Sequence, residues 1–418
     1  MNINKKIKII GFCKKYIEKN KKDTLIDPNI YFCSFADTLG YFFLKYKCYE
    51  DISNLIRKWL YKILNIIYAL KTNEFEIYNL KKNTTKKIFF TYGKLNDFNK
   101  RGEFEDRYFG KIKQKKSLVV VIYLDQKLPI NIKNNIVIIK QKKTNIAVSV
   151  FNLLKFNNLK NINLKYFSHE TLSSFFLTKK LETILEQSKG VRIANILYES
   201  QNFNLSFINI LKKKNIKVIG FIHSILPALP TNLIFKEPSP DKIFVSGDDT
   251  VRIAKTLGWN KKKIIQIKSI RFSKSKHITK NMCNKLFLPI QITNYNFYEK
   301  TIKKFFLLNQ EFRTNLQIKE HPSTNKNSHY ISFLSKVNNY LSSFKLKQGK
   351  QLKISFFIGS TSSVIEALER GLRVVHFVDD TVFQLYEKPL FKNIITTKLM
   401  DGVYSYRLLK KNSYIKLN

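Results

Sequence analysis

The chain is poor in the residues that build several common kinds of site. Four of its 418 residues are cysteines (Cys13, Cys33, Cys48 and Cys283), with no CxxC pair and no histidine at metal-ligand spacing. This pattern excludes a disulfide framework and a zinc site of the usual spacing. Glycine is also scarce, with 13 residues, and neither GxGxxG nor GxxxxGK[ST] occurs. The sequence therefore argues against dinucleotide dehydrogenases and P-loop kinases.

Signal-peptide and membrane-spanning patterns are missing as well. The apolar run near the N-terminus, residues 7–12, is short and interrupted by Lys8, whereas a signal peptide has a longer uncharged core. The most apolar stretch, residues 52–70, contains Arg57, Lys58 and Lys62, and a spanning helix needs about 20 mostly uncharged residues. We therefore expect the mature chain to begin at its first residues and to stay in the reducing cytoplasm.

Acidic residues are few: 30 Asp and Glu stand against 75 Lys and Arg, a formal net charge of +45. Such an excess is compatible with nucleic-acid binding. However, the lysines are spread along the whole sequence, and no helix-turn-helix, zinc-finger or RNP1 pattern concentrates them. We therefore disfavour a nucleic-acid partner. A basic surface is attracted to the anionic inner leaflet, so we expect peripheral association with the inner membrane face.

A basic amphipathic helix is predicted around Trp59. Apolar residues recur at helical spacing through residues 55–67, and Arg57, Lys58 and Lys62 lie mostly on the opposite face. Such a helix can lie on a membrane surface or pack against its own domain. We favour packing, because most amphipathic helices of globular proteins face a core.

Short apolar runs alternate with helical patterns over most of the chain, which is 44% hydrophobic. Strands are expected at residues 87–91, 118–123, 136–139, 193–198, 216–222, 243–245, 264–267, 285–290, 315–319, 354–358 and 373–377. Helices are expected at residues 170–187, 204–213, 250–257, 298–308, 328–341 and 363–369. This alternation predicts an α/β protein with parallel sheets and crossover helices.

A polar, basic segment divides the sequence into two parts. Residues 269–284 lack apolar periodicity, and we predict a linker at residues 271–284. It separates a Rossmann-like domain at residues 1–270 from a second one at residues 285–418, which we expect to end in a helical tail.

The dipeptide His321-Pro322 follows a predicted strand. Proline forces the residue before it into an extended conformation, which places the imidazole at the carboxyl edge of the sheet, where open α/β sheets bind ligands. A histidine there can donate a hydrogen bond to a phosphate oxygen. Taken alone, the dipeptide is explained more simply by a histidine that ends a strand beside a turn.

A second polar group follows the next predicted strand. Ser360, Thr361, Ser362 and Ser363 precede a short predicted helix, and Ser363 with Glu366 fits a capping box. The simpler interpretation is a well-capped crossover helix. The functional interpretation adds that hydroxyls and N–H groups at a helix N-terminus form an anion site. Because both polar groups follow successive strands of one βαβ unit, we expect them to face the same crevice.

Together, these motifs resemble the nucleotide-binding half of GT-B glycosyltransferases of bacterial surface polysaccharide synthesis. The resemblance is to the CMP-sugar group, the sialyl-, polysialyl- and Kdo-transferases of capsule assembly, and more loosely to the CDP-glycerol polyol-phosphate transferases of teichoic acid synthesis. It implies a GT-B-like α/β fold in which two Rossmann-like domains face an interdomain cleft. It also implies that the nucleotide phosphate is bound by His321, Pro322, Ser360, Thr361, Ser362 and Ser363.

Other stretches are similar to surface-carbohydrate biosynthesis proteins of the same type. These are residues 198–224, residues 240–272 and the segment FEDRYFG at residues 104–110. The resemblance thus covers roughly residues 100–380. The CMP-sugar enzymes carry an acidic D/E-D/E-G element in their N-terminal domain, and this sequence has no clean copy of it. The resemblance therefore does not identify the general base.

Two residues are candidates for that base. Glu199 follows the predicted strand at residues 193–198, and His223 follows the one at residues 216–222, so both are expected at the carboxyl edge of the first sheet. Either side chain can remove a proton from an attacking sugar hydroxyl. Glu199 could instead cap a helix, and His223 could be a structural histidine before a proline-rich loop. Arg271 is a further candidate, as a bidentate ligand of the donor phosphate or of the sugar carboxylate. It could instead be a surface residue at the hinge.

The sequence therefore predicts a glycosyltransferase that uses a nucleotide sugar, in our interpretation CMP-linked, and a glycan or lipid-linked glycan acceptor. No cofactor and no metal are expected, because cationic side chains and a helix dipole can neutralise the leaving phosphate. One alternative is a CDP-polyol phosphotransferase, in which a different bond of the donor breaks. Another is a nucleic-acid-binding protein without catalytic activity.

Overall fold

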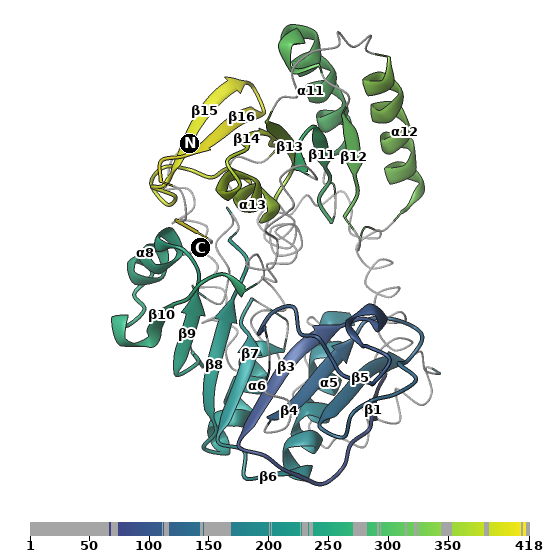
Figure 1. The fold of residues 1–418 in the computed structure, drawn as a ribbon, viewed down its shortest axis with the longest axis vertical. Helices are drawn as coiled ribbons and strands as arrows, with labels where there is room; N and C mark the ends of the chain where they lie inside the picture. Colours follow the sequence, from purple (N-terminus) through teal and green to yellow (C-terminus); the bar gives the residue numbers. More distant parts are fainter. Residues whose placement is uncertain are drawn as a thin grey trace, which may run out of the picture.

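The computed structural model describes residues 67, 74–110, 112, 117–142, 145, 169–199, 201, 203–225, 227, 233, 237–270, 282–290, 292, 294–313, 316–321, 324, 326–343, 353–379, 384–410 and 413–414. These residues form two lobes, each built around one large sheet (Figure 1). We refer to residues 74–270 as the N-terminal lobe and to residues 282–410 as the C-terminal lobe.

Eight strands form the sheet of the N-terminal lobe, in the order β1-β5-β4-β3-β7-β8-β9-β10. All neighbouring strands are parallel except β1 and β5. The bounds are β1 (Glu74–Tyr78), β3 (Lys87–Gly93), β4 (Ser117–Tyr123), β5 (Ile136–Lys142), β7 (Ile193–Leu197), β8 (Lys217–Ile222), β9 (Lys242–Val245) and β10 (Ile264–Gln266). All residues of β4 are buried, as expected for a central parallel strand covered on both faces.

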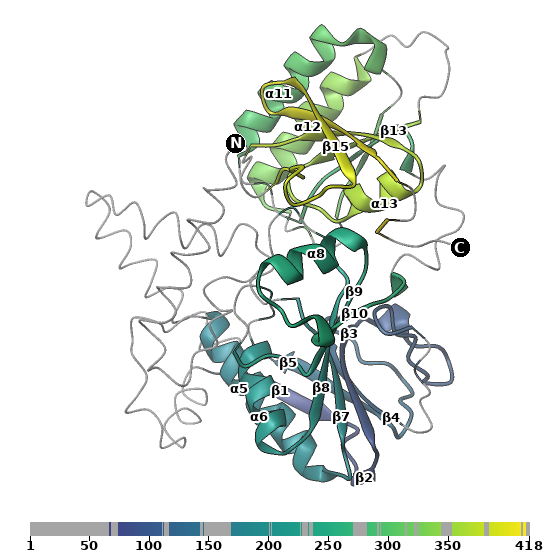
Figure 2. The ribbon, with the colours of Figure 1, turned by 90° about the vertical axis from the view of Figure 1, so that its left-hand side faces the viewer.

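The described residues of this lobe include three α-helices: α5 (His169–Gln187), α6 (Asn204–Lys213) and α8 (Asp248–Thr256). Helix α6 packs through Leu205, Ile208 and Leu211, which are buried and spaced three residues apart. Figure 2 shows α5 and α6 on one face of the sheet and α8 between the two lobes. The remaining short elements are β2 (Asn83–Thr84), β6 (Ser188–Lys189), η4 (Leu95–Asp97) and η8 (Lys261–Lys263).

Six strands form the sheet of the C-terminal lobe, in the order β12-β11-β13-β14-β16-β15. The bounds are β11 (Lys285–Phe287), β12 (Gln317–Lys319), β13 (Ile354–Ile358), β14 (Arg373–Phe377), β15 (Ile394–Met400) and β16 (Val403–Leu408). The helices are α11 (Tyr295–Leu308), η9 (Gln310–Phe312), α12 (Ser328–Ser342) and α13 (Ser363–Glu369). Asparagine side chains cap two of them, because Asn294 accepts from Phe297 N and Asn327 accepts from Tyr330 N.

These sheets confirm the predicted α/β class. Each of the eleven strands and six helices of the predicted alternating pattern has a counterpart, with ends shifted by up to three residues. The predicted helical tail is wrong for residues 394–408, which form the antiparallel hairpin β15–β16. Its turn contains Asp401 and Gly402, and Gly402 has a φ of 74°. An Asp-Gly turn between strands favours a hairpin, because glycine adopts positive φ without strain.

Both lobes have the connectivity of doubly wound sheets. From β3 the chain builds outward to β4 and β5 and then returns to the other side of β3 with β7. From β11 it moves to β12 and then returns to the other side with β13. The strand order therefore reverses between β3 and β7 and between β11 and β13, and ligands of such folds bind outside the carboxyl ends of the strands at these points.

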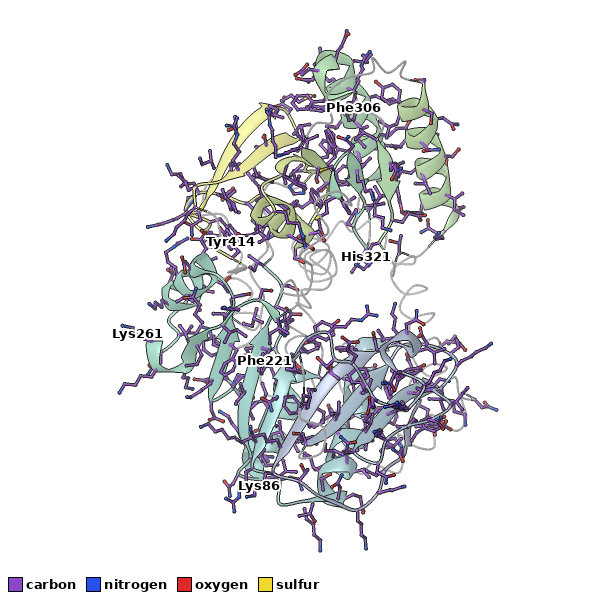
Figure 3. The ribbon with its side chains drawn as sticks, in the orientation of Figure 1. Lys86, Phe221, Lys261, Phe306, His321 and Tyr414 are labelled. Carbon is purple, nitrogen blue, oxygen red and sulfur yellow. The ribbon has the colours of Figure 1, made fainter. Side chains whose placement is uncertain are left out.

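The carboxyl ends of the two sheets face each other. Lys86, just before β3, lies at the far end of the N-terminal lobe, whereas Phe221, near the end of β8, lies toward the other lobe (Figure 3). His321 follows β12 and lies at the margin of the C-terminal lobe that faces the N-terminal lobe. Both reversal points are therefore directed into the region between the lobes.

The lobes share buried contacts on one side. A single apolar cluster contains Ile253 and Trp259 of the N-terminal lobe together with Leu368 and Tyr386 of the C-terminal lobe. Asp249, on α8, also forms hydrogen bonds between the lobes. Its carboxylate accepts from the backbone N–H groups of Lys392 and Asn393, both at 3.1 Å.

Tyr414 and Arg252 add to this contact. The Tyr414 hydroxyl donates to Asp249 Oδ2, and its backbone N–H donates to Glu369 Oε1 at 2.7 Å. Arg252 Nη2 lies 2.9 Å from Asp249 Oδ1, and the same side chain donates to the carbonyls of Pro389 and Leu390. Asp249 is therefore the centre of a polar contact between the lobes, which we call the Asp249 hub.

Candidate functional site

The C-terminal half of the candidate site lies at the reversal point between β11 and β13. Pro289 follows β11 and Gly359 follows β13. A Cβ placed on Gly359 would lie 3.4 Å from Pro289 Cγ and 3.5 Å from the Tyr298 hydroxyl, and Gly359 has a φ of 62°. The left-handed conformation favours glycine here, whereas the two contacts of the Cβ would be ordinary van der Waals contacts.

The predicted Ser/Thr cluster begins immediately after Gly359. Ser362 is buried, and Ser360, Thr361 and Ser363 are half-buried. Among the described residues, the buried hydroxyl oxygen of Ser360 has no hydrogen-bond partner. A buried hydroxyl that makes no hydrogen bond is unfavourable by roughly 1–3 kcal/mol. This oxygen is therefore well placed to bind a polar ligand.

The predicted capping box is absent from helix α13. The N-cap residue is Ser362 and makes no side-chain cap. Instead, Thr361 Oγ1 accepts from Ser363 N at 3.3 Å, and Glu366 pairs with Arg370 at 2.8 Å. The capping box is absent because the helix begins at Ser363, one residue earlier than the pattern requires, which places Ser363 inside the first turn.

The helix N-terminus itself offers little for an anion. Helix α13 has 7 residues, and the N–H groups of Val364 and Ile365 donate to the carbonyls of Thr361 and Ser362. These N–H groups are therefore not available to bind an anion in the way that the sequence predicted. The hydroxyl groups of the cluster are the better ligands in this structure.

His321 lies on the other side of Pro289 from Gly359. It is half-buried at the end of β12, and its carbonyl accepts from Thr324 N at 3.1 Å. Thr324 in turn donates through its hydroxyl to the Pro289 carbonyl at 3.4 Å. Strand β11 lies between β12 and β13, so His321 and the Ser/Thr cluster share one sheet edge but do not follow neighbouring strands.

His376 is a residue of this half that the sequence did not single out. It is fully buried on β14, with Nε2 2.5 Å from the Gly359 carbonyl and Nδ1 3.0 Å from the Tyr406 hydroxyl. A carbonyl can only accept, so Nε2 carries the proton and Nδ1 accepts from Tyr406. Burial lowers the pKa of His376 to about 4. The neutral imidazole thus fixes Gly359 and the start of the Ser/Thr cluster.

The N-terminal half of the candidate site contains both predicted base candidates. Glu199 follows β7, and His223 follows β8, the neighbouring strand. Both are buried. Glu199 Oε1 accepts from the backbone N–H of His223 at 2.6 Å and from that of Ser224. One carboxylate oxygen of Glu199 therefore holds the backbone that carries His223.

Aromatic side chains surround the His223 ring. Phe221 stacks on it with ring centroids 5.9 Å apart, and Tyr108 and Phe109 lie at 5.8 Å and 6.4 Å. Tyr108 and Phe109 come from the segment at residues 104–110, which resembles surface-carbohydrate biosynthesis proteins but was not predicted to lie at the site. This segment therefore forms one wall around His223.

The same segment places a buried carboxyl group near the edge of the sheet. Asp106 Oδ1 accepts from Tyr108 N at 2.7 Å and from Phe109 N at 2.5 Å. Burial raises the pKa of Asp106 above its usual value. No local sequence pattern marks Asp106, because its burial depends on the return of the chain after η4.

The two halves meet at the hydroxyl of Tyr386. This hydroxyl lies 2.8 Å from the carbonyl of Ile225, two residues after His223, and 3.3 Å from the carbonyl of Thr361. Residues that the sequence predicted on separate domains are thus brought to one place by a tyrosine that it did not single out.

Comparison with known proteins shows distant structural similarity only. No protein-family model matches the sequence, and no curated protein does. Among solved structures, the chain is similar to an α,α-trehalose 6-phosphate synthase from Burkholderia multivorans, with 8% identity, a TM-score of 0.35, and 61% of this chain and 69% of that one covered. It is also similar to a UDP-glucosyltransferase from Polygonum tinctorium, with 9% identity, a TM-score of 0.35, and coverage of 74% and 82%. Scores this low carry no argument about function, which must come from the site.

Several predicted features lie outside the described residues. These are Arg271, Pro322 and the amphipathic stretch around Trp59. Within the described residues, no helix is long and apolar enough to cross a membrane.

Proposed function

We propose that the protein is a glycosyltransferase of the GT-B type, which transfers a sugar from a nucleotide donor to a hydroxyl of an acceptor. The observation that carries this proposal is the Tyr386 contact, because it joins the His223 loop of one sheet edge to the Ser/Thr cluster of the other. A group transfer between two substrates needs two binding regions that face one another at bonding distance.

The donor nucleotide is assigned to the C-terminal lobe. His321 and the hydroxyls of Ser360 and Ser362 stabilise the phosphate as it leaves, since hydrogen-bond donors fixed in a partly buried site stabilise developing negative charge. Pro322, Thr361 and Ser363 belong to the same nucleotide-binding group, and Arg271 is proposed as an additional phosphate ligand. The buried Ser360 oxygen without a partner supports this assignment.

The acceptor is assigned to the N-terminal lobe, with His223 as general base. His223 takes the proton from the acceptor hydroxyl, whose oxygen then forms a bond with the anomeric carbon of the donor sugar. The bond between that carbon and the phosphate oxygen breaks, and its electron pair leaves with the nucleotide. Glu199 is the alternative base. We favour His223, because one oxygen of Glu199 already accepts two backbone hydrogen bonds.

The finer assignments rest on the sequence motifs. We propose a CMP-linked donor and a glycan or lipid-linked acceptor of bacterial surface polysaccharide, because His321 and the Ser/Thr cluster resemble those of the CMP-sugar transferases. Peripheral association with the inner membrane face is supported by the net charge of +45. The CDP-polyol phosphotransferase alternative lacks the flanking pattern of that family after His223, where the sequence reads SILPALP.

Calorimetric titration with CMP, CDP, UDP and GDP tests the proposal, with His321→Ala as the site variant. His329→Ala is the matched control, because His329 is exposed on α12. We expect one nucleotide, CMP, to bind, and we expect the site variant to weaken its affinity about tenfold or more, in line with loss of a charge-assisted hydrogen bond. Binding of no nucleotide by the wild type would refute the proposal.

A further inference from the structure

Basic side chains gather at the amino edge of the N-terminal sheet, the edge opposite the candidate site. Strands β3, β7 and β8 are parallel neighbours, so their first residues lie side by side. Arg192 N donates to the Lys86 carbonyl at 3.0 Å, and Lys217 N donates to the Arg192 carbonyl at 2.9 Å. Lys86 lies at the end of the lobe that is turned away from the C-terminal lobe (Figure 3). These three residues therefore share one end of the molecule.

Two further segments bring lysines to the same edge. Helix α6 ends in Lys212 and Lys213, and the chain turns at Asn215, with a φ of 55°, into β8. Strand β6 contains Lys189, whose carbonyl accepts from Thr85 N at 3.1 Å, two residues before β3. We refer to the exposed basic residues of these segments as the basic edge: Lys86, Lys87, Lys189, Arg192, Lys213, Lys214 and Lys217.

Little negative charge offsets the basic edge. None of its side chains forms an ion pair with a carboxylate among the described residues. Glu186 is exposed near the end of α5, and the carboxylate of Asp241 accepts from Val218 N at 2.7 Å. Elsewhere in this lobe exposed lysines do pair, as Lys133 does with Glu103 at 2.9 Å. The basic edge is therefore a local concentration of uncompensated positive charge.

The residue types of the basic edge favour one class of partner. Its segments, residues 81–87, 188–193 and 212–217, contain no aromatic residue, whereas proteins that bind single-stranded nucleic acid stack aromatic side chains on the bases. Reading a duplex needs an element that enters a groove, and this edge consists of strand ends and turns. A bilayer with anionic lipids attracts clustered lysines and arginines without either feature.

We infer that the basic edge docks the protein on an anionic lipid bilayer. Strand β3 has 7 residues, which at about 3.3 Å per residue separates the two edges of the sheet by roughly 20 Å. The carboxyl edge, with Glu199 and His223, then lies about that far from the lipid headgroups and opens away from them. The docking does not depend on the proposed function. Under that function, however, the site would act on the growing end of a glycan and not on the sugar attached to its lipid.

Co-sedimentation of the full chain with lipid vesicles tests the docking. Vesicles of phosphatidylcholine alone are compared with vesicles that also contain phosphatidylglycerol, at low and at high salt. The edge variant combines three substitutions: Lys86→Gln, Arg192→Gln and Lys217→Gln. Each lysine or arginine close to an anionic surface strengthens binding roughly fivefold, so the edge variant should bind the anionic vesicles about 10²-fold more weakly than wild type.

A control variant loses the same amount of charge at exposed positions beside the lobe boundary, on α8 and η8: Lys255→Gln, Lys261→Gln and Lys262→Gln. Lys261 lies on the flank of the lobe, away from Lys86 (Figure 3). Charges farther than about 8 Å from the lipid are screened at physiological salt, so the control variant should bind less than about threefold more weakly than wild type. Circular dichroism of both variants should match wild type, because all six positions are exposed.

Three results would overturn the inference. Equal weakening in both variants would assign the attraction to net charge and not to this edge. Wild type that binds no anionic vesicles would leave the edge without a lipid partner. Oligouridine RNA or a short DNA duplex that displaces the vesicles, and that the edge variant no longer binds, would assign the edge to nucleic acid. None of these results depends on nucleotide binding, so each leaves the proposed glycosyltransferase activity standing.

Discussion

Replacing Asp249 by asparagine tests whether the Asp249 hub holds the two lobes together. The carboxylate is 2% exposed, and its two oxygens accept from Lys392 N, Asn393 N, Arg252 Nη2 and the Tyr414 hydroxyl. Asparagine keeps one oxygen and replaces the other by an NH₂ group, which only donates. Two of the four donors then lose their acceptor.

The expected effect is large for a single isosteric change. A hydrogen bond to a charged acceptor contributes about 1.5–3 kcal/mol, so the loss of two predicts that the free energy of unfolding falls by about 3–6 kcal/mol. Breaking a buried ion pair has a similar effect, about 3–5 kcal/mol. Equilibrium unfolding in urea, followed by tryptophan fluorescence and by circular dichroism, measures this difference. Because Trp259 lies in the apolar cluster shared by the lobes, its fluorescence should change first.

Asp248→Asn is the matched control for this prediction. Asp248 is the neighbouring residue on α8, is exposed, and accepts one side-chain hydrogen bond from Gln266 at 2.8 Å. Its substitution should change stability by less than about 0.5 kcal/mol, as is usual at exposed positions. If Asp249→Asn and Asp248→Asn had equal effects, the hub would contribute nothing to the contact between the lobes.

Three further predictions concern single side chains. His376→Leu removes the buried donor to the Gly359 carbonyl, so we expect a loss of about 1–3 kcal/mol of stability in thermal unfolding, together with weaker nucleotide binding; unchanged binding would separate His376 from the site. Because the folded-state pKa of Asp106 is raised above 3.8, its contribution to stability is greatest at low pH and is lost as the pH rises through the folded-state pKa. The stability of wild type relative to Asp106→Asn should therefore fall with increasing pH, and a difference independent of pH would contradict this. His223→Gln should lower kcat by about 10²–10⁴ while Glu199→Gln lowers it much less; the opposite order in steady-state assays would identify Glu199 as the base.

Much of the fold could be predicted because its strands are continuous apolar runs. The run ISFFI predicts β13 with the observed bounds, Ile354–Ile358, and all of its residues are buried. The hairpin β15–β16 was missed although Asp401-Gly402 is a strong turn signal. Strand β15 lies at the edge of the sheet, and its buried and exposed residues alternate only weakly. The two-residue repeat of apolar side chains that indicates a strand is therefore faint in this segment.

The site could be predicted only where it follows strand ends. His321, Glu199 and His223 were predicted in this way, since the carboxyl ends of parallel strands meet at one edge, and their roles stay predictions. Tyr386 does not follow a strand, and its partner Ile225 is far away in the sequence. Tyr386 contacts Ile225 across 161 positions, and no local pattern of residues indicates such a contact.

The Asp249 hub also has a consequence for synthesis of the protein. Two of its donors, Lys392 and Tyr414, are made 143 and 165 residues after Asp249 itself. At about 5–20 residues per second, the ribosome takes roughly 10–30 s to deliver the last of them. The N-terminal sheet is complete by then, but the charged carboxylate and the apolar face of α8 still lack their covering. Slow translation of the second lobe would lengthen this exposure, so the yield of soluble protein should depend on codon choice in the second half of the gene more than in the first.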